Sequence, residues 1–233
     1  MKYLWILVFA LVSQINLNAQ TVDHSKWDQL LKKHVSPNGK VNYSGFKKDI
    51  AELDAYLEIL SSSSVDQLSG RNEKMAYWIN AYNAFTIKLI VDNYPVSSIT
   101  KLHGGKPWDV KWVNLGGKNY SLNNIENDIL RPVYKDARIH FAVNCAALSC
   151  PPLLNKAFTA SNLNALLDQQ TKKFINNTSF NQIDATKVSI SKIFEWYSVD
   201  FPKLIEFINK YSTQKVNTNA KVKYNEYDWK LNG

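Results

Sequence analysis

The sequence predicts an α+β fold in a single domain, with helices packed around a small, mainly antiparallel sheet. Three observations lead to this prediction. Segments with helical spacing of apolar residues dominate the first half of the chain, short alternating segments lie mostly in the second half, and strict strand–helix–strand alternation is missing. No repeat, low-complexity tract or linker divides residues 20–233, so we expect one domain over that range.

The first 19 residues have the pattern of a secretory signal peptide. Lys2 gives a positive start, residues 3–12 form an uninterrupted apolar run, and Ala19 is a small residue at a plausible cleavage point. A bilayer span needs roughly 20 apolar residues, which is more than this run provides. We therefore expect residues 1–19 to be removed and the domain to be extracytoplasmic, either periplasmic or secreted, without a stable membrane anchor.

The charge pattern bears on the class of partner. The formal net charge is +8, but the lysines are scattered among Asp and Glu, and no basic block interrupts the chain. Such scattering is typical of a solvated surface rather than a nucleic-acid interface. We expect a small-molecule or peptide-like substrate and no nucleic acid, and the sequence makes no prediction of the oligomeric state.

The first part of the domain predicts helices. Residues 23–35 carry apolar side chains at helical spacing, and residues 36–39 form a strong turn signal. A short strand is expected at residues 41–43. Residues 46–60 then predict an amphipathic helix, which ends at the serine run of residues 61–64.

The strongest helix prediction covers residues 72–93, which are apolar on nearly every side and end before Pro95. Asn80 and Asn83 stand three apart and therefore share one face of this helix. A buried amide without hydrogen-bond partners costs about 1–3 kcal/mol. The two residues are therefore expected either to brace a neighbouring loop or to line a substrate pocket.

The second half predicts short elements. Its glycine-rich segment, residues 103–117, lacks the strand and helix that flank a phosphate-binding loop, so no nucleotide cofactor is expected. The expected elements are a loop and hairpin at 103–117, a helix at 125–130 that stops before Pro132, a strand at 139–144, a helix at 160–174, a strand at 188–190, residues 193–197 leading into a helix at 202–211, and a strand with one irregularity at 222–231.

Chemistry is concentrated in residues 138–152, which hold one of the four histidines and both cysteines. Cys145 ends the expected strand and begins a short helical turn, a position that lowers a thiol pKa. An unperturbed thiol is only about 3% ionised at neutral pH, and half ionisation requires roughly 2 kcal/mol. His140 is the obvious base, but residues five apart on a regular strand face opposite sides, so the chain must bend after Phe141.

Three other roles for the cysteines stay open from the residues alone. An even cysteine count in an exported protein favours a disulfide between Cys145 and Cys150. The two could also be buried thiols, or zinc ligands together with His140. The intervals between these three residues do not match the usual zinc-ligand spacings, so no metal is expected. Glu126 is the candidate carboxylate partner of His140, although an acidic residue in a first helical turn is also ordinary.

Several runs of the chain resemble one known family, the domain of unknown function 547. They are residues 39–43, 76–84, 121–132, 139–145 with 149–151, 193–197 with 200–201, and 227–232. The resemblance implies a distant similarity to cysteine peptidases, with a Cys–His–Glu arrangement that corresponds here to Cys145, His140 and Glu126. Many members of the family carry histidine directly after the glutamate. This chain has Asn127 there, so it would rely on His140 as the base.

Two functions are therefore expected as alternatives. The first is a thiol-dependent hydrolase or acyltransferase for amide or peptide-like substrates, without a cofactor. Cys145 would be the nucleophile, His140 the base and Glu126 its orienting partner, with Asn80 or Asn83 polarising a carbonyl.

The second is a non-catalytic glycan- or peptide-binding module with structural cysteines. In that function the aromatic side chains Trp108, Trp112 and Trp196 would line a groove.

Overall fold

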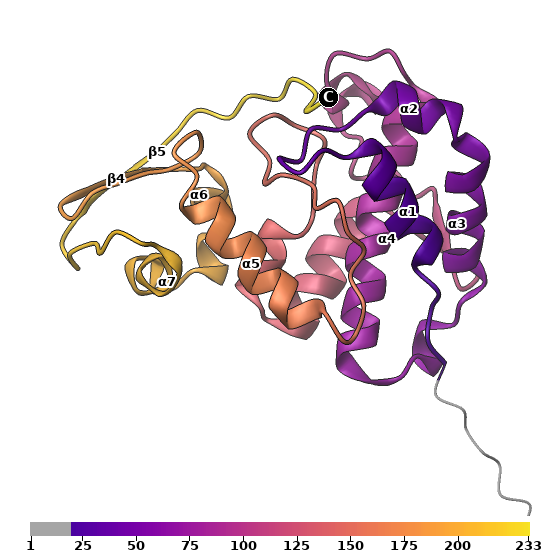
Figure 1. Cartoon of the computed structure of the whole chain (residues 1–233), viewed down its shortest axis with the longest axis horizontal. Helices are drawn as coiled ribbons and strands as arrows, with labels where there is room; N and C mark the ends of the chain where they lie inside the picture. The colour runs from indigo at the N-terminus through magenta and orange to yellow at the C-terminus, as the bar shows by residue number, and fades with distance from the viewer. Residues whose placement is uncertain (1–19) are drawn as a thin grey trace, which may run out of the picture.

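The computed structural model describes residues 20–233 and has the predicted α+β fold (Figure 1). The expected signal peptide, residues 1–19, lies outside the described residues. The elements are α1 (Ser25–His34), α2 (Tyr43–Lys48), α3 (Ile50–Ser62), η1 (Val65–Gln67), α4 (Gly70–Asp92), η2 (Ile99–Lys101), η3 (His103–Gly105), β1 (Val113–Leu115), β2 (Lys118–Tyr120), η4 (Asn124–Tyr134), η5 (Ala137–Phe141), α5 (Leu163–Ile175), β3 (Gln182–Ile183), β4 (Lys187–Ile190), α6 (Ile193–Trp196), η6 (Ser198–Asp200), α7 (Leu204–Tyr211) and β5 (Lys221–Tyr224).

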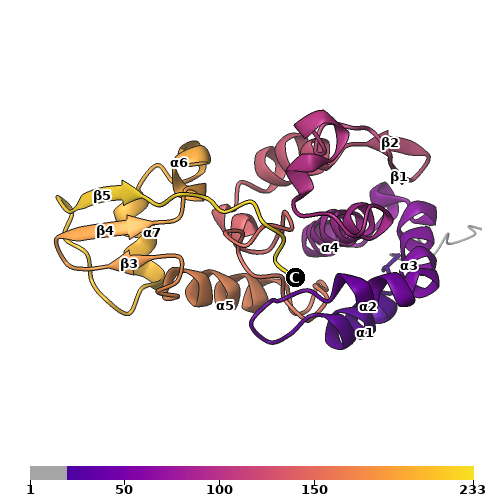
Figure 2. The same ribbon diagram turned by 90° about the horizontal axis from the view of Figure 1, so that it is seen from above.

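Helix α4 is the centre of the larger part of the molecule, as its sequence predicts. It packs against α2, α3 and η4, and Figure 2 shows it enclosed by them. Its side chains are buried on nearly every side, Ile79 and Ile90 among them. Among the helices of residues 20–233, none combines the length and apolar character that crossing a membrane requires.

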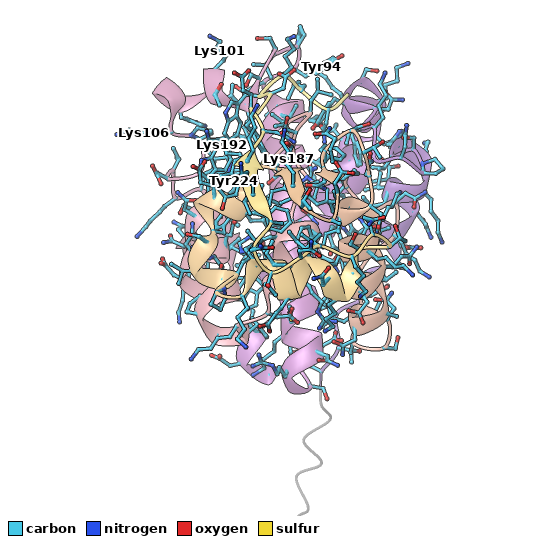
Figure 3. The ribbon with its side chains drawn as sticks, turned by 90° about the vertical axis from the view of Figure 1, so that its left-hand side faces the viewer. Tyr94, Lys101, Lys106, Lys187, Lys192 and Tyr224 are labelled. Atoms are coloured by element: carbon cyan, nitrogen blue, oxygen red, sulfur yellow. The ribbon has the colours of Figure 1, made fainter. Side chains whose placement is uncertain are left out.

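The strands form two small sheets. β1 and β2 make an antiparallel hairpin, and β3 also pairs with β4 in antiparallel fashion. β5 joins the other edge of β4 in parallel, because the chain first crosses over through α6 and α7. Figure 3 looks onto this end of the molecule, where Lys187 begins β4 and Tyr224 ends β5.

The described chain has two hydrophobic cores. The larger core is built on α1 to α4 and extends to Ala142 and Val143. The smaller core is largely aromatic and joins the end of α5 to β4, α6 and α7, with Phe141 at its centre. Since Phe141 and Ala142 are neighbours in sequence, the chain passes from one core to the other at this point.

The strand expected at residues 139–144 is wrong. Residues 137–141 form the 3-10 helix η5, and an irregular segment follows. A short apolar run does not distinguish a strand from another buried segment, and here Ile139 and Phe141 enter different cores instead of facing a partner strand. The bend that His140 and Cys145 need in order to face one site is therefore present.

Three other predicted boundaries also differ. The expected strand at residues 41–43 is only a single bridge, because α2 begins at Tyr43. The helix expected at residues 46–60 is divided into α2 and α3 at Asp49. The helix expected to stop before Pro132 continues to Tyr134, with the wide hydrogen bonding of a π-helix.

The expected C-terminal strand ends early, at Tyr224. Beyond it the chain leaves the small sheet and crosses to the larger core (Figure 1). There it runs beside the segment after Cys145: the amide of Leu148 donates to the carbonyl of Lys230 at 2.8 Å, and Ala147 forms a bridge with Leu231. The C-terminal segment, residues 225–233, thus ties the two cores together.

Candidate active site

A cavity of about 350 Å³ lies between the two cores. Tyr82 and Val143 of the larger core line one side, and Ile193 of the smaller core lines the other. The three residues predicted to carry the chemistry all line it as well: Glu126, His140 and Cys145.

His140 is buried on η5 and is held through one ring nitrogen. Its Nε2 lies 2.7 Å from Oδ2 of Asp200, and Nε of Arg131 donates to the same oxygen at 2.6 Å. The hydrogen bond from His140, assisted by Arg131, lowers the pKa of Asp200 to about 2. An ionised carboxylate only accepts hydrogen bonds, so Nε2 carries the proton and Nδ1 is the nitrogen left for chemistry.

Glu126 is buried on η4, on the other side of the imidazole ring. Its Oε1 lies 4.0 Å from Nδ1 of His140, which is beyond hydrogen-bond length. The ring of Tyr197 stacks on His140 with centroids 4.0 Å apart. Burial and the nearby charge of Glu126 raise the pKa of Tyr197 far above its ordinary value, so this phenol remains a donor.

The Cys145 thiol is partly exposed and surrounded by donors. Its Sγ lies 3.1 Å from the hydroxyl of Tyr227, and both cysteines are free thiols. A hydrogen bond from Cys150, with smaller contributions from Tyr227 and the amide of Ala147, lowers the pKa of Cys145. Burial raises the pKa of Cys150 well above its ordinary value. The two thiols therefore differ, and Cys145 is the one that ionises first.

Neutral hydrogen bonds fix the turn that presents Cys145. Ala146 has a φ of 64°, a left-handed conformation that is unusual for alanine. The side chain of Asn144 accepts from the amide of Ala146 at 3.0 Å and from the side chain of Asn232 at 3.1 Å. Tyr43 in turn donates to Asn232 at 2.6 Å. The positive φ is thus held in place by the buried amides and by the C-terminal segment.

Asn80 and Asn83 act as braces. Asn80 donates to the carbonyl of Phe158 at 2.7 Å and accepts from its amide at 3.1 Å. Asn83 donates to the carbonyl of Ala142 and accepts from the amide of Asn144, both at 2.8 Å. Neither residue lines the cavity. Of the two alternatives that the sequence left open, their placement favours the brace and not the substrate pocket.

The sequence did not predict the residues that contact His140 and Cys145 from far away in the sequence. Asp200 is not among the predicted site residues, because nothing in the local sequence connects it with His140, 60 positions away. Arg131, Tyr197 and Tyr227 were not singled out. The signal that existed was the setting of Asp200 and Tyr197 in an aromatic-rich stretch after an expected strand.

The three tryptophans predicted to line a groove are divided between two places. Trp108 and Trp196 line the cavity, whereas Trp112 packs against Phe85 and does not. Within residues 20–233, no group of three or more His, Cys, Asp and Glu side chains is placed to hold a metal ion. His140, Cys145 and Cys150 line one cavity, but they do not form a ligand set.

Comparison with known proteins gives one result. Residues 65–175 match the family described as "Protein of unknown function, DUF547", which confirms the family resemblance seen in the sequence. The matched range includes Glu126, His140 and both cysteines, while Asp200 and the C-terminal segment lie beyond it. No curated protein and no solved structure matches the chain.

Proposed function

We propose that this member of the DUF547 family is a thiol-dependent hydrolase or acyltransferase that acts on amide or peptide-like bonds, with Cys145 as nucleophile and His140 as base. One observation carries the proposal. A partly exposed thiol whose pKa is lowered lines the same cavity as a histidine whose far nitrogen is held by a carboxylate. A nucleophile, a base and a group that orients the base are the components of covalent acyl transfer.

The reaction would proceed in two steps. The ionised Sγ of Cys145 forms a bond to the substrate carbonyl carbon, and protonated Nδ1 of His140 gives its proton to the departing nitrogen as the carbon–nitrogen bond breaks. The thioester that results is then attacked by water or by an acceptor amine. That nucleophile loses its proton to His140, the carbon–sulfur bond breaks, and the thiolate is restored.

Asp200 takes the orienting role that was expected of Glu126. It is at hydrogen-bond distance from His140, whereas Glu126 is not. By occupying Nε2 it fixes the tautomer and leaves Nδ1, the nitrogen nearer to Glu126, free to accept a proton. Arg131 holds Asp200 in place and also lies over the ring of Tyr197, with its guanidinium carbon 4.9 Å from the centroid.

The test is the reactivity of Cys145. Iodoacetamide should label the reduced native protein at Cys145 faster than it labels a small model thiol at pH 7, since only the thiolate reacts. Cys150, which is buried with a raised pKa, should stay unlabelled and is the internal control. Labelling of Cys145 no faster than the model thiol, or an intact disulfide between the two cysteines in the active protein, would contradict the proposal.

The expected export makes the redox state of the two cysteines part of this test. We propose an extracytoplasmic location from the signal-peptide pattern of residues 1–19, and an oxidising compartment favours joining the two thiols. Amino-terminal sequencing of the protein from the periplasm or medium should give a chain that starts at Gln20. Peptide mapping of the same material under non-reducing conditions reports the state of Cys145.

A second candidate function is a glycan- or peptide-binding module. It is favoured by the aromatic side chains that line the cavity. Among them, the rings of Trp196 and Trp229 stack with their centroids 5.8 Å apart. In that case Cys145→Ser should leave ligand binding intact while lowering stability. Loss of turnover with intact binding in the same variant would instead support the enzyme.

A further inference from the structure

Within residues 20–233, the cavity is lined by a carboxyl group but by no lysine or arginine side chain. Among the side chains that line it within the described chain, Glu126 is the carboxylate, and neither Lys nor Arg is present. Glu126 is 4% exposed, and its closest ionisable base is His140 at 4.0 Å. The nearby cation of Arg131 is already matched by Asp200. The lining therefore presents a buried carboxylate without a cation of its own.

The net charge does not depend on where the catalytic proton resides. A neutral thiol and a neutral imidazole carry no charge, and the charges of the Cys145 thiolate and the His140 imidazolium cancel each other. Cys150 and Tyr227 stay neutral because burial raises their pKa values. Glu126 is thus the one carboxyl group of the described lining, with no Lys or Arg beside it in that lining, and a bound cation would supply the counter-charge that the lining lacks.

The wall of the cavity is suited to a cation. Trp108, Trp196, Tyr227 and Trp229 form a continuous aromatic cluster with neighbouring ring centroids 4.6 to 5.8 Å apart. Trp196 lines the cavity and is 45% exposed, so solvent reaches this wall. The negative faces of aromatic rings attract ammonium groups, tryptophan most strongly, and the attraction grows where water is excluded.

We propose that the cavity recognises an alkylammonium group on its substrate, held between Glu126 and the wall of Trp108, Trp196 and Trp229. This specificity rests on the proposed function only for the bond that is cleaved. Since Glu126 lies 4.0 Å from His140, the ammonium group is close to the reacting carbonyl. The substrate class is thus an amide or peptide-like compound that carries a primary or quaternary ammonium near its scissile bond.

The experiment compares two probes of the same shape. Choline and its uncharged carbon analogue, in which a tert-butyl group replaces the trimethylammonium, are titrated into the reduced full chain while tryptophan fluorescence is followed. Choline should bind about tenfold more tightly than the analogue. Glu126→Gln should remove this preference. Glu195→Gln, an exposed glutamate on α6 that does not line the cavity, should keep it.

Equal affinity for the two probes in the wild-type chain would overturn the proposal, and that comparison needs no variant to fold. Retention of the full preference in a folded Glu126→Gln protein would overturn it as well. Cys145→Ser keeps Glu126 and the aromatic wall and should retain the preference for choline over the analogue. Choline binding thus decides the specificity, while iodoacetamide labelling of Cys145 separately decides the proposed chemistry.

Discussion

The two sides of the cavity are built from different interactions. The turn that carries Cys145 is fixed by neutral groups, namely the amides of Asn83, Asn144 and Asn232. The ring of His140 is fixed by charges, through Asp200 and Arg131. The first side belongs to the larger core, and the second meets the smaller, aromatic core.

This difference separates two requirements of covalent catalysis. A nucleophile has to stay in position whatever the pH, and hydrogen bonds between neutral buried groups do not titrate. A base has to change its charge during each turnover, and a fixed carboxylate stabilises its charged form. The comparison predicts that disturbing the thiol side changes stability equally at all pH values, whereas disturbing the histidine side changes it only where Asp200 is ionised.

The largest effect is expected for Asn144→Ala on the thiol side. Asn144 also donates to the carbonyl of Pro151 at 2.9 Å, so the change removes one hydrogen bond from each of three buried partners. We expect a loss of about 3 kcal/mol in the free energy of unfolding, from roughly 1 kcal/mol for each bond. Urea titrations at pH 4 and pH 8 should give the same loss. The exposed Asn119→Ala should change little. A loss that depends strongly on pH would contradict the neutral character of this side.

A smaller and pH-dependent effect is expected for Asp200→Asn. The pKa of Asp200 is about 2 in the folded protein against an ordinary 3.8, so its ionised form stabilises the fold above pH 4. That contribution, about 2 kcal/mol, is lost as the pH falls from 4 to 2. The variant should therefore be less stable than the wild type at pH 7 and nearly equal to it at pH 2. Equal differences at both pH values would show that charge does not hold His140, and the exposed Asp184→Asn is the matched control.

The same division explains what the sequence could predict. Helix α4 was predictable because apolar residues occupy nearly every side of it. Glu126, His140 and Cys145 were predictable as site residues because their side chains are of the types that carry acid–base and nucleophilic chemistry. The bracing by Asn80 and Asn83 was one of two alternatives, since an amide on an apolar helix must find partners but the sequence does not name them. The partners are Phe158, Ala142 and Asn144.

The histidine side could not be predicted in this way. The pairing of Arg131 with Asp200 joins residues 69 apart, and His140 meets Asp200 across 60 residues. Such contacts leave no local periodicity, because each partner obeys the pattern of its own segment. The strand predicted around His140 was wrong for a related reason: apolar residues on both sides of it serve two different cores.

Cys150→Ala should reduce the reactivity of Cys145. The hydrogen bond from Cys150 is the main factor that lowers the pKa of Cys145, so its removal raises that pKa. The rate of labelling by iodoacetamide at pH 7 should fall several-fold, while the rate at high pH, where the thiol is fully ionised, should stay the same. This variant cannot form the internal disulfide, so oxidation does not obscure the result. Unchanged reactivity at pH 7 would mean that Cys150 has only a packing role.

The smallest effect is expected for Tyr227→Phe, which removes one hydroxyl from the C-terminal segment and keeps its ring beside Trp196 and Trp229. The hydrogen bond from Tyr227 contributes less to the lowered pKa of Cys145 than the one from Cys150 does. Labelling at pH 7 should therefore slow in the same direction as in Cys150→Ala, but less. Tyr211→Phe removes a hydroxyl bonded to Asp168, away from the cavity, and should leave the labelling rate unchanged. If Tyr227→Phe slowed labelling more than Cys150→Ala, the thiolate would depend chiefly on the C-terminal segment, and the thiol side would no longer rest on the larger core alone.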